Sequence, residues 1–421
     1  MKKETRFPSR IQESAESFGR LREVFQGAKS CLQEAMFAVG LEVLGQMLEE
    51  DRTRLVGPRY RHTQGRAASR GGHTRGQIEL AGRKVSIPRP RVRSVQGQEM
   101  ALPTYEAAQG RDLLGHSTLE RILAGASARS YSRTLDPLGE IPSRGISRSA
   151  VSRRFVAKTS HAVEEFLHRS LEGQDYPVLF FDGKLVSRRA VIVALGVDVQ
   201  GKKRILGLLE GSSENAALCR ELLRDLIERG LDPARMRLVV LDGGKGLRKA
   251  IEEVLGARAL IQRCQAHKMR NVLELLPQTR RPYVRECLRR AYRMEDTKAA
   301  SEKLHRLASR IETSDPQAAA SIREGLEETL TVMGLQLPES LRRSLVTSNL
   351  IESALSIVEP LVRRVKRWRA GSMIVRWVGA GLIEAEKRFR AVRGYQAMPL
   401  LLAALERKLG NSTLCSKEKV A

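Results

Sequence analysis

The sequence is poor in cysteine. Only five cysteines occur among 421 residues, and they are scattered along the chain as Cys31, Cys219, Cys264, Cys287 and Cys415. An odd, dispersed set of this kind provides neither a disulfide framework nor the paired CxxC motifs of a structural zinc site. We therefore expect a protein of a reducing compartment.

Long apolar runs are also missing. No stretch approaches the roughly 20 apolar residues that cross a bilayer, and the start, MKKETRFPSR, lacks the apolar core of a signal peptide. We expect a cytoplasmic, nucleoid-associated protein with no membrane partner.

Acidic residues are few relative to basic ones. The chain carries 48 Asp and Glu against 74 Lys and Arg, a formal net charge of +26. Such an excess of positive charge favours a polyanionic partner, and nucleic acid is the commonest, since neutralising phosphates releases condensed counterions. An anionic membrane is the rival. The length of 421 residues suggests two to four domains, and 42% hydrophobic residues are enough apolar material for packed cores.

The first 108 residues predict a helix followed by a basic hairpin. In the N-terminal helical region, 1–50, apolar residues recur at helical spacing from Gln33 to Met47, and this face could be core or dimer seam. In the basic region, 51–108, apolar residues alternate on either side of Ala81-Gly82-Arg83, which indicates a hairpin. Its basic residues, which could be a solvated face but favour phosphate contact, are Arg83, Lys84, Arg89, Arg91 and Arg93.

Residues 109–170 read as a helical, DNA-binding region. In GISRSAVSRRFVAK, a short turn precedes Ser147, a plausible helix cap, and a basic face with Arg148, Arg153 and Arg154. This combination is typical of a helix-turn-helix-like recognition helix, although an ordinary basic surface helix is the alternative.

The remainder alternates between an α/β pattern and helices. Region 171–267 begins with three apolar runs that read as strands with short connections. With the helices and strands that follow them, the predicted order of elements is β-β-β-α-β-α-β. Region 268–345 reads as an all-α insertion, 346–410 as further helices, and 411–421 as a tail. The densest basic cluster of the last helices, RRVKRWR, supplies Arg363, Arg364, Lys366, Arg367 and Arg369.

Two aspartates are placed to bind a divalent metal ion. Asp182 ends the first strand in FFDG, and Asp242 ends the fourth in VVLDGG. Strand ends expose side chains at the rim of a sheet, and Mg²⁺ prefers hard carboxylate oxygens. Either Asp-Gly pair alone is more often a turn, but the two together in this strand order favour ligands.

A third carboxylate is expected from a helix packed on the same rim. Glu352 in TSNLIESAL is the candidate, because Thr347, Ser348 or Asn349 could cap a helix that carries it in the first turns. Glu359 and Glu384 compete for this role, and the residues alone exclude neither.

Cys264 and His267 in IQRCQAHK lie three positions apart. They lack the second pair of ligands that tetrahedral zinc needs, and no third group orients them for nucleophilic catalysis. We expect them to support or pack beside the carboxylates.

Taken together, FFDGK, VVLDGGKGLRKAI, QRCQAHKMRNVLELLP, TSNLIES and VKRWRAGSMIVRW resemble the insertion sequence 256, or mutator-type, family of bacterial DDE transposases over roughly residues 75–400. The resemblance implies an α/β RNase H-like catalytic core interrupted by an all-α insertion, preceded by the hairpin and helix-turn-helix-like regions. Asp182, Asp242 and Glu352 match the family's acidic triad, and Cys264 and His267 match its CxxH element.

The function implied is DNA transposition. Two Mg²⁺ or Mn²⁺ ions, held by the triad, would assist cleavage at terminal inverted repeats and joining of the 3′-hydroxyl to target DNA. A homodimer or larger assembly would bring two ends together. The alternatives are an RNase H-like nuclease without strand transfer and a non-catalytic DNA-binding regulator derived from a transposase.

Overall fold

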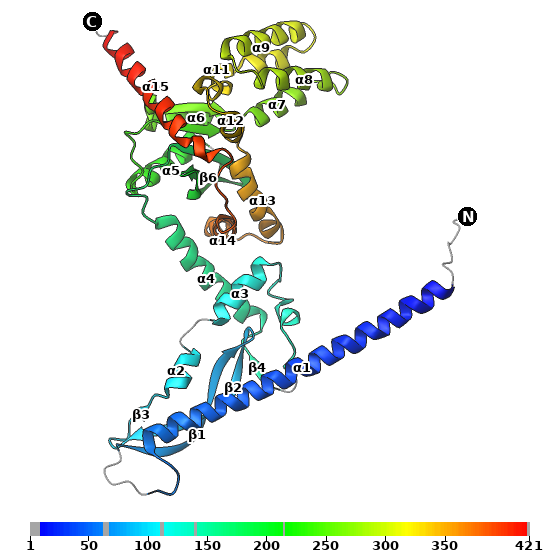
Figure 1. Ribbon diagram of the computed structural model, residues 1–421, viewed down its shortest axis with the longest axis vertical. Coiled ribbons are helices and arrows are strands. Elements are labelled where there is room, and N and C mark those ends of the chain that lie inside the picture. The colour runs from blue at the N-terminus through cyan, green and yellow to red at the C-terminus, as the bar shows by residue number, and fades with distance from the viewer. Residues whose placement is uncertain (1–8, 62–66, 110–112, 139–140, 214, 419–421) are drawn as a thin grey trace. The chain divides into compact units, whose positions relative to one another are not determined.

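A computed structural model describes residues 9–61, 67–109, 113–138, 141–213 and 215–418. The described residues leave out residues 1–8 of the N-terminal region, Gly139 of the predicted helical region 109–170 and residues 419–421 of the expected tail. The chain divides into two compact units, Met1–Lys158 and Thr159–Ala421, which we describe separately (Figure 1).

In the first unit a long helix packs on a hairpin. Helix α1 (Ser9–Val56) lies along strands β1 (Ala68–Leu80) and β2 (Arg83–Ser94), and the short strands β3 (Glu99–Met100) and β4 (Ser143–Arg144) pair with β2. The hairpin prediction is confirmed, but its turn is shorter than expected. Leu80 pairs with Arg83, and only Ala81 and Gly82 form the turn, both with positive φ (48° and 78°). This matches a two-residue turn that follows the twist of the strands.

The rest of this unit is less helical than predicted. It comprises α2 (Pro103–Gln109), α3 (Leu113–Leu123), a 3-10 turn (Tyr131–Thr134) and α4 (Arg148–His168), which continues into the second unit. Residues 124–147 separate α3 from α4, and the 3-10 turn and β4 lie between them, so no described helix directly precedes the turn before Ser147 as a helix-turn-helix would require. Ser147 does cap α4, since its Oγ accepts the Ala150 N–H at 3.3 Å.

The second unit is built on a five-stranded mixed sheet in the order β7-β6-β5-β8-β9. The strands are β5 (Val178–Val186), β6 (Arg189–Val197), β7 (Lys203–Gly211), β8 (Arg237–Leu241) and β9 (Ala259–Arg263). β6 runs antiparallel to β5 and β7, whereas β8 and β9 are parallel to β5. With α5 (Ala216–Glu228) and α6 (Lys245–Val254), the predicted element order is confirmed.

Alternation along the strands gives the sheet two apolar faces. On one face Phe180 and its neighbours pack with α13 (Asn349–Arg363) and α14 (Gly371–Glu386). On the other face Phe181 packs with α5 and α6. Burial on both sides explains why these strands read as continuous apolar runs in the sequence.

A helical segment lies between β9 and α13, as predicted. It contains α7 (Gln265–Glu274), α8 (Arg281–Tyr292), α9 (Thr297–Glu312), α10 (Pro316–Arg323), α11 (Leu326–Thr329) and α12 (Glu339–Leu345). The first four of these helices enclose a separate hydrophobic core.

The basic cluster RRVKRWR is mostly not helical. Only Arg363 belongs to α13, and the following residues up to Ala370 connect α13 to α14. Consecutive long basic side chains there make no apolar stripe with which a helix could pack. Helix α15 (Met398–Glu418) then runs through most of the expected tail.

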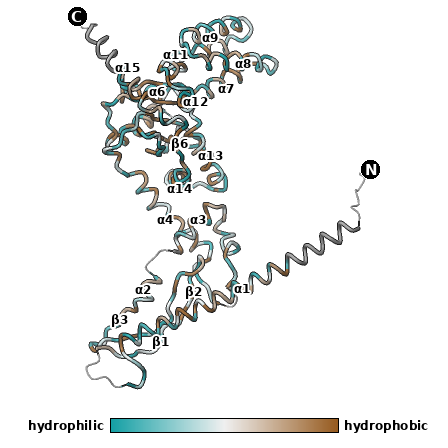
Figure 2. Tube along the Cα trace, viewed as in Figure 1, coloured by the Kyte–Doolittle hydropathy of each residue, from teal (hydrophilic) through white to brown (hydrophobic). Residues whose placement is uncertain are grey.

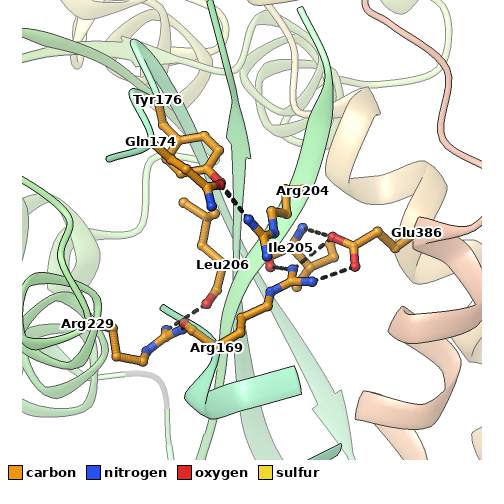
Figure 3. Close-up of polar contacts among 8 residues, drawn as sticks. All are labelled: Arg169, Gln174, Tyr176, Arg204, Ile205, Leu206, Arg229 and Glu386. Carbon is orange, nitrogen blue, oxygen red and sulfur yellow. Dashed lines mark hydrogen bonds and ion pairs between the residues drawn. The ribbon is translucent and has the colours of Figure 1, made fainter. Parts of the chain in front are cut away.

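A charged network fixes α14 to the sheet (Figure 3). Arg169 donates two hydrogen bonds of 2.8 Å to the carboxylate of Glu386, which also accepts the Ile205 N–H at 2.9 Å. Arg229 donates to the carbonyls of Leu206 and Arg169. Arg169 also donates to the carbonyl of Ile205, so the Arg169–Glu386 pair ties the end of α14 to strand β7.

Within the described residues, no single helix combines the length and apolar composition needed to span a membrane, and one bent pair, α12 with α13, meets that test only jointly.

Candidate active site

Asp182 lies inside a strand. We expected it to end the strand, but β5 continues to Val186, because it pairs with β6 as far as Val186↔Arg189. The parallel pairing with β8 runs through Phe180↔Val240, and β8 ends at Leu241. Asp182 lies two residues after Phe180, and Asp242 lies two residues after Val240, so both aspartates follow the last parallel pair in the same register. The pairing of β5 with β8 therefore places the two aspartates next to each other at the carboxyl end of this parallel pair.

The pKa of Asp182 reports on its surroundings. Burial, with the negative charges of Asp242 and Glu352, raises it from 3.8 to about 7, against the opposing effects of His267 and the Gly183 N–H. Asp182 is only 7% exposed. A buried carboxylate with two anionic neighbours is electrostatically unfavourable unless a cation or a proton joins it.

Glu352 comes from the first turn of α13, as expected. Ser348 occupies the N-cap position, but its side chain does not cap the helix. Its Oγ instead donates to Glu352 Oε1 at 2.6 Å. This contact holds the carboxylate in one orientation next to the aspartates.

The competing glutamates are engaged elsewhere. Glu359 pairs with Lys184 at 2.6 Å and with Arg363 at 2.5 Å, and the Lys184 hydrogen bond lowers its pKa. Glu384 pairs with Lys387 at 3.0 Å. Both carboxylates are thus already neutralised by a cationic side chain, so Glu352 is the helical carboxylate that the fold brings to Asp182.

Cys264 and His267 lie directly behind Glu352. The buried Cys264 Sγ accepts the Ser348 N–H at 3.3 Å, and Ser348 Oγ lies 3.2 Å from it. His267 Nδ1 lies 3.1 Å from Ser348 Oγ, while its Nε2 is 3.6 Å from Glu352 Oε1. Burial raises the pKa of the Cys264 thiol, but hydrogen bonds from His267 and Ser348 outweigh this effect and lower it.

One ligand atom each from Cys264, His267 and Glu352 lies within 4.8 Å of the others, which is close enough to hold a metal ion. Two observations argue for a supporting role instead. A structural zinc site needs a fourth protein ligand, and the group contains only three among the described residues. In addition, Ser348 already links all three groups by hydrogen bonds.

Sequence analysis did not identify Ser348 as a partner of Glu352, nor Lys184 as a partner of Glu359. The spacing of these residues in the sequence held part of this information. Ser348 precedes Glu352 by one helical turn, and Lys184 follows Asp182 by two positions, on the same face of β5.

The basic residues expected to contact DNA differ in how freely their side chains could reach a phosphate. Arg83 is buried and donates to the Asp136 carbonyl, so it is not free to contact a phosphate and that expectation is wrong. Arg89 and Arg91 both pair with Glu99, and Arg154 donates to Thr118. Lys84 is half-buried. The exposed members are Arg93, Arg148, Arg153, Arg363, Arg364, Lys366, Arg367 and Arg369.

Comparison with known proteins is consistent across most of the chain. Residues 17–391 match the family model described as "Transposase, Mutator family". The chain is 26% identical over 323 residues, 74% of its length and 79% of the relative's, to the "Transposase for insertion sequence element IS256 in transposon Tn4001" of Staphylococcus aureus.

Two further relatives extend this similarity. The chain is 30% identical to the transposase for insertion sequence element IS6120 of Mycolicibacterium smegmatis, over 56% of its own length and 73% of the relative's. It is 29% identical to the transposase for IS905 of Lactococcus lactis, over 68% and 71% respectively.

Proposed function

Because this chain belongs to the Mutator family of transposases, we propose that it cleaves DNA at the ends of a mobile element and joins the freed 3′-hydroxyl to target DNA. We assign the chemistry to a DDE-type site formed by Asp182, Asp242 and Glu352. The observation that carries this proposal is that β5, the end of β8 and α13 bring three carboxylates close enough for Asp242 and Glu352 both to raise the pKa of the buried Asp182. An RNase H-like core is the fold we infer, and the mixed sheet covered by helices on both faces supports it.

The residues present suit divalent metal ions. The three carboxylates offer hard oxygen ligands, and burial together with the charges of Asp242 and Glu352 raises the pKa of Asp182, an effect that a bound cation would oppose. We propose two Mg²⁺ or Mn²⁺ ions, which Asp182, Asp242 and Glu352 would hold. Bound ions would supply Lewis-acid stabilisation and a more acidic attacking hydroxyl.

The chain itself contributes orientation and DNA binding. Ser348 holds Glu352 by a hydrogen bond, so this carboxylate is oriented before DNA arrives. We assign DNA backbone contacts to the exposed basic residues of α4, Arg148 and Arg153, and to the connection from Arg364 to Arg369. Such contacts position a duplex without reading its sequence.

The test uses the full chain, labelled DNA carrying the terminal inverted repeats, a target plasmid and Mg²⁺ or Mn²⁺. We expect nicked ends and joined products, and we expect Asp182→Asn to abolish both while DNA binding is unchanged. Asp296→Asn is the matched control, because it removes one negative charge from a helix cap that asparagine fills equally well.

The outcomes separate the alternatives. Full activity of Asp182→Asn contradicts the assignment of the site. Nicks without joined products identify a nuclease, and DNA binding with neither product identifies a regulator.

A further inference from the structure

Helix α1 carries two apolar stripes, and the described residues of the first unit cover only one of them. The covered stripe includes Phe37, Leu41, Leu44 and Leu48, which belong to the core formed with the hairpin. The other stripe is exposed, and hydrophobic positions recur along α1 (Figure 2). Its members are between 46% and 69% exposed: Phe25, Leu32, Met36, Val39, Val43 and Met47. A line of large exposed apolar side chains along one face of a helix marks an interaction surface.

The spacing of this exposed stripe is that of a coiled coil. Leu32, Met36, Val39 and Val43 are separated by four, three and four positions, and Phe25 precedes Leu32 by seven. The sequence repeats the seven-residue interval at Phe18 and Ile11, within the 48 residues of α1. A seven-residue apolar repeat keeps one seam of a helix facing a partner helix over several turns.

The charge of residues 30–50 argues against DNA as the occupant. In a chain of net charge +26, residues 30–50 contain the acids Glu34, Glu42, Glu49 and Glu50 and no basic residue. Phosphates would be repelled by this segment, and apolar side chains offer them no hydrogen bonds. The partner must be apolar and must tolerate acidic flanks.

We propose that the exposed stripe of α1 pairs with the same stripe of a second copy of this chain, with the two helices antiparallel. Lys29 interrupts the stripe seven positions before Met36, and Glu50 interrupts it seven positions after Val43. In a parallel pair each of these charges faces itself. In an antiparallel pair Lys29 lies against the acidic end of the second copy, so the surface is self-complementary about a two-fold axis.

The register follows from the apolar centre of the stripe. A two-fold axis between Met36 and Val39 sets Met36 against Val39 of the second copy, and Leu32 against Val43 of the second copy. Lys29 then faces Gln46 and lies between Glu42 and Glu50. This pairing does not depend on the catalytic proposal, because it requires neither metal nor DNA.

The test is the mass of the DNA-free full chain, measured by sedimentation equilibrium over a range of concentrations. We expect a dimer for the wild type and at least about 100-fold weaker association for Met36→Glu/Val39→Glu, because four charges enter the seam. The matched control is Cys31→Glu/Ala38→Glu, which adds the same charges at exposed positions off both stripes. It should associate like the wild type.

Cross-linking tests the direction. In a Cys31→Ser background, a Lys29→Cys chain mixed with a Gln46→Cys chain should form a disulfide-linked dimer, whereas neither chain alone should. A monomeric wild type, which is the result if the second unit of the same chain covers the stripe, overturns the proposal, as does equal weakening by the control pair. Self-cross-linking of Lys29→Cys overturns the antiparallel arrangement.

Discussion

Replacing Asp182 by asparagine should stabilise the metal-free protein while removing its activity. The pKa of Asp182 is raised from 3.8 to about 7 in the folded chain. A difference of about 3 pKa units corresponds to about 4 kcal/mol of unfavourable free energy when the carboxylate is ionised. Because Asp242 and Glu352 share the repulsion and adjust to it, we expect Asp182→Asn to raise the free energy of unfolding by about 2 kcal/mol.

The direction in which stability changes with pH follows from the raised pKa of Asp182. The unfolded carboxylate is ionised above about 3.8, while the folded one keeps its proton up to about 7. The wild type therefore loses stability relative to the variant as pH rises from about 4 to 7, and the deficit is complete above 7. The advantage of Asp182→Asn should be larger at pH 8 than at pH 5.

The measurement is thermal unfolding of the full chain in EDTA at both pH values, with Asp296→Asn as the charge control. About 2 kcal/mol corresponds to roughly 4–8 °C for a unit of this size. Adding Mn²⁺ should reverse the order, because a bound cation stabilises the wild type more than the variant. An Asp182→Asn chain no more stable than the wild type in EDTA at pH 8, or a gain that does not depend on pH, refutes the reasoning.

Other substitutions test single contacts. Ser348→Ala should weaken Mn²⁺ binding and DNA cleavage about 10-fold by releasing Glu352, and Ser348→Thr should retain most of both; equal Mn²⁺ affinity of the alanine chain contradicts a positioning role. Burial lowers the pKa of Lys268 from 10.5 to about 8, so Lys268→Met should gain about 1 kcal/mol of stability at pH 7. That gain should shrink as pH rises from 8 to 10.5, and denaturant unfolding at both ends of this window measures it. Ala81→Asn should stabilise the hairpin unit by about 0.5–1 kcal/mol, because asparagine tolerates the positive φ of this turn position; an unchanged melting temperature would count against this.

Local patterns predicted the elements well. Three features were recognisable in the sequence: the apolar runs of the sheet, the helix that begins after Ser147 and the hairpin at Ala81-Gly82. Alternation and turn preferences depend on neighbours in the chain, so they can be read from the sequence. The same local reasoning misjudged Asp182 as a strand end, because Asp-Gly resembles a turn while the pairing with β6 carries β5 four residues farther. It also read the basic connection after Arg363 as helix.

The sequence by itself determined which residues were capable of the chemistry: carboxylates after apolar runs, a strongly basic chain and an amphipathic helix near the start. Only the tertiary structure decided which of them meet. It paired Glu359 with Lys184 and left Glu352 facing Asp182, it turned Ser348 from a helix cap into a hydrogen-bond donor to that glutamate, and it covered one stripe of α1 while exposing the other. The physical reason is that chemical identity and periodicity are local properties, whereas burial and proximity arise from packing between segments far apart in the chain.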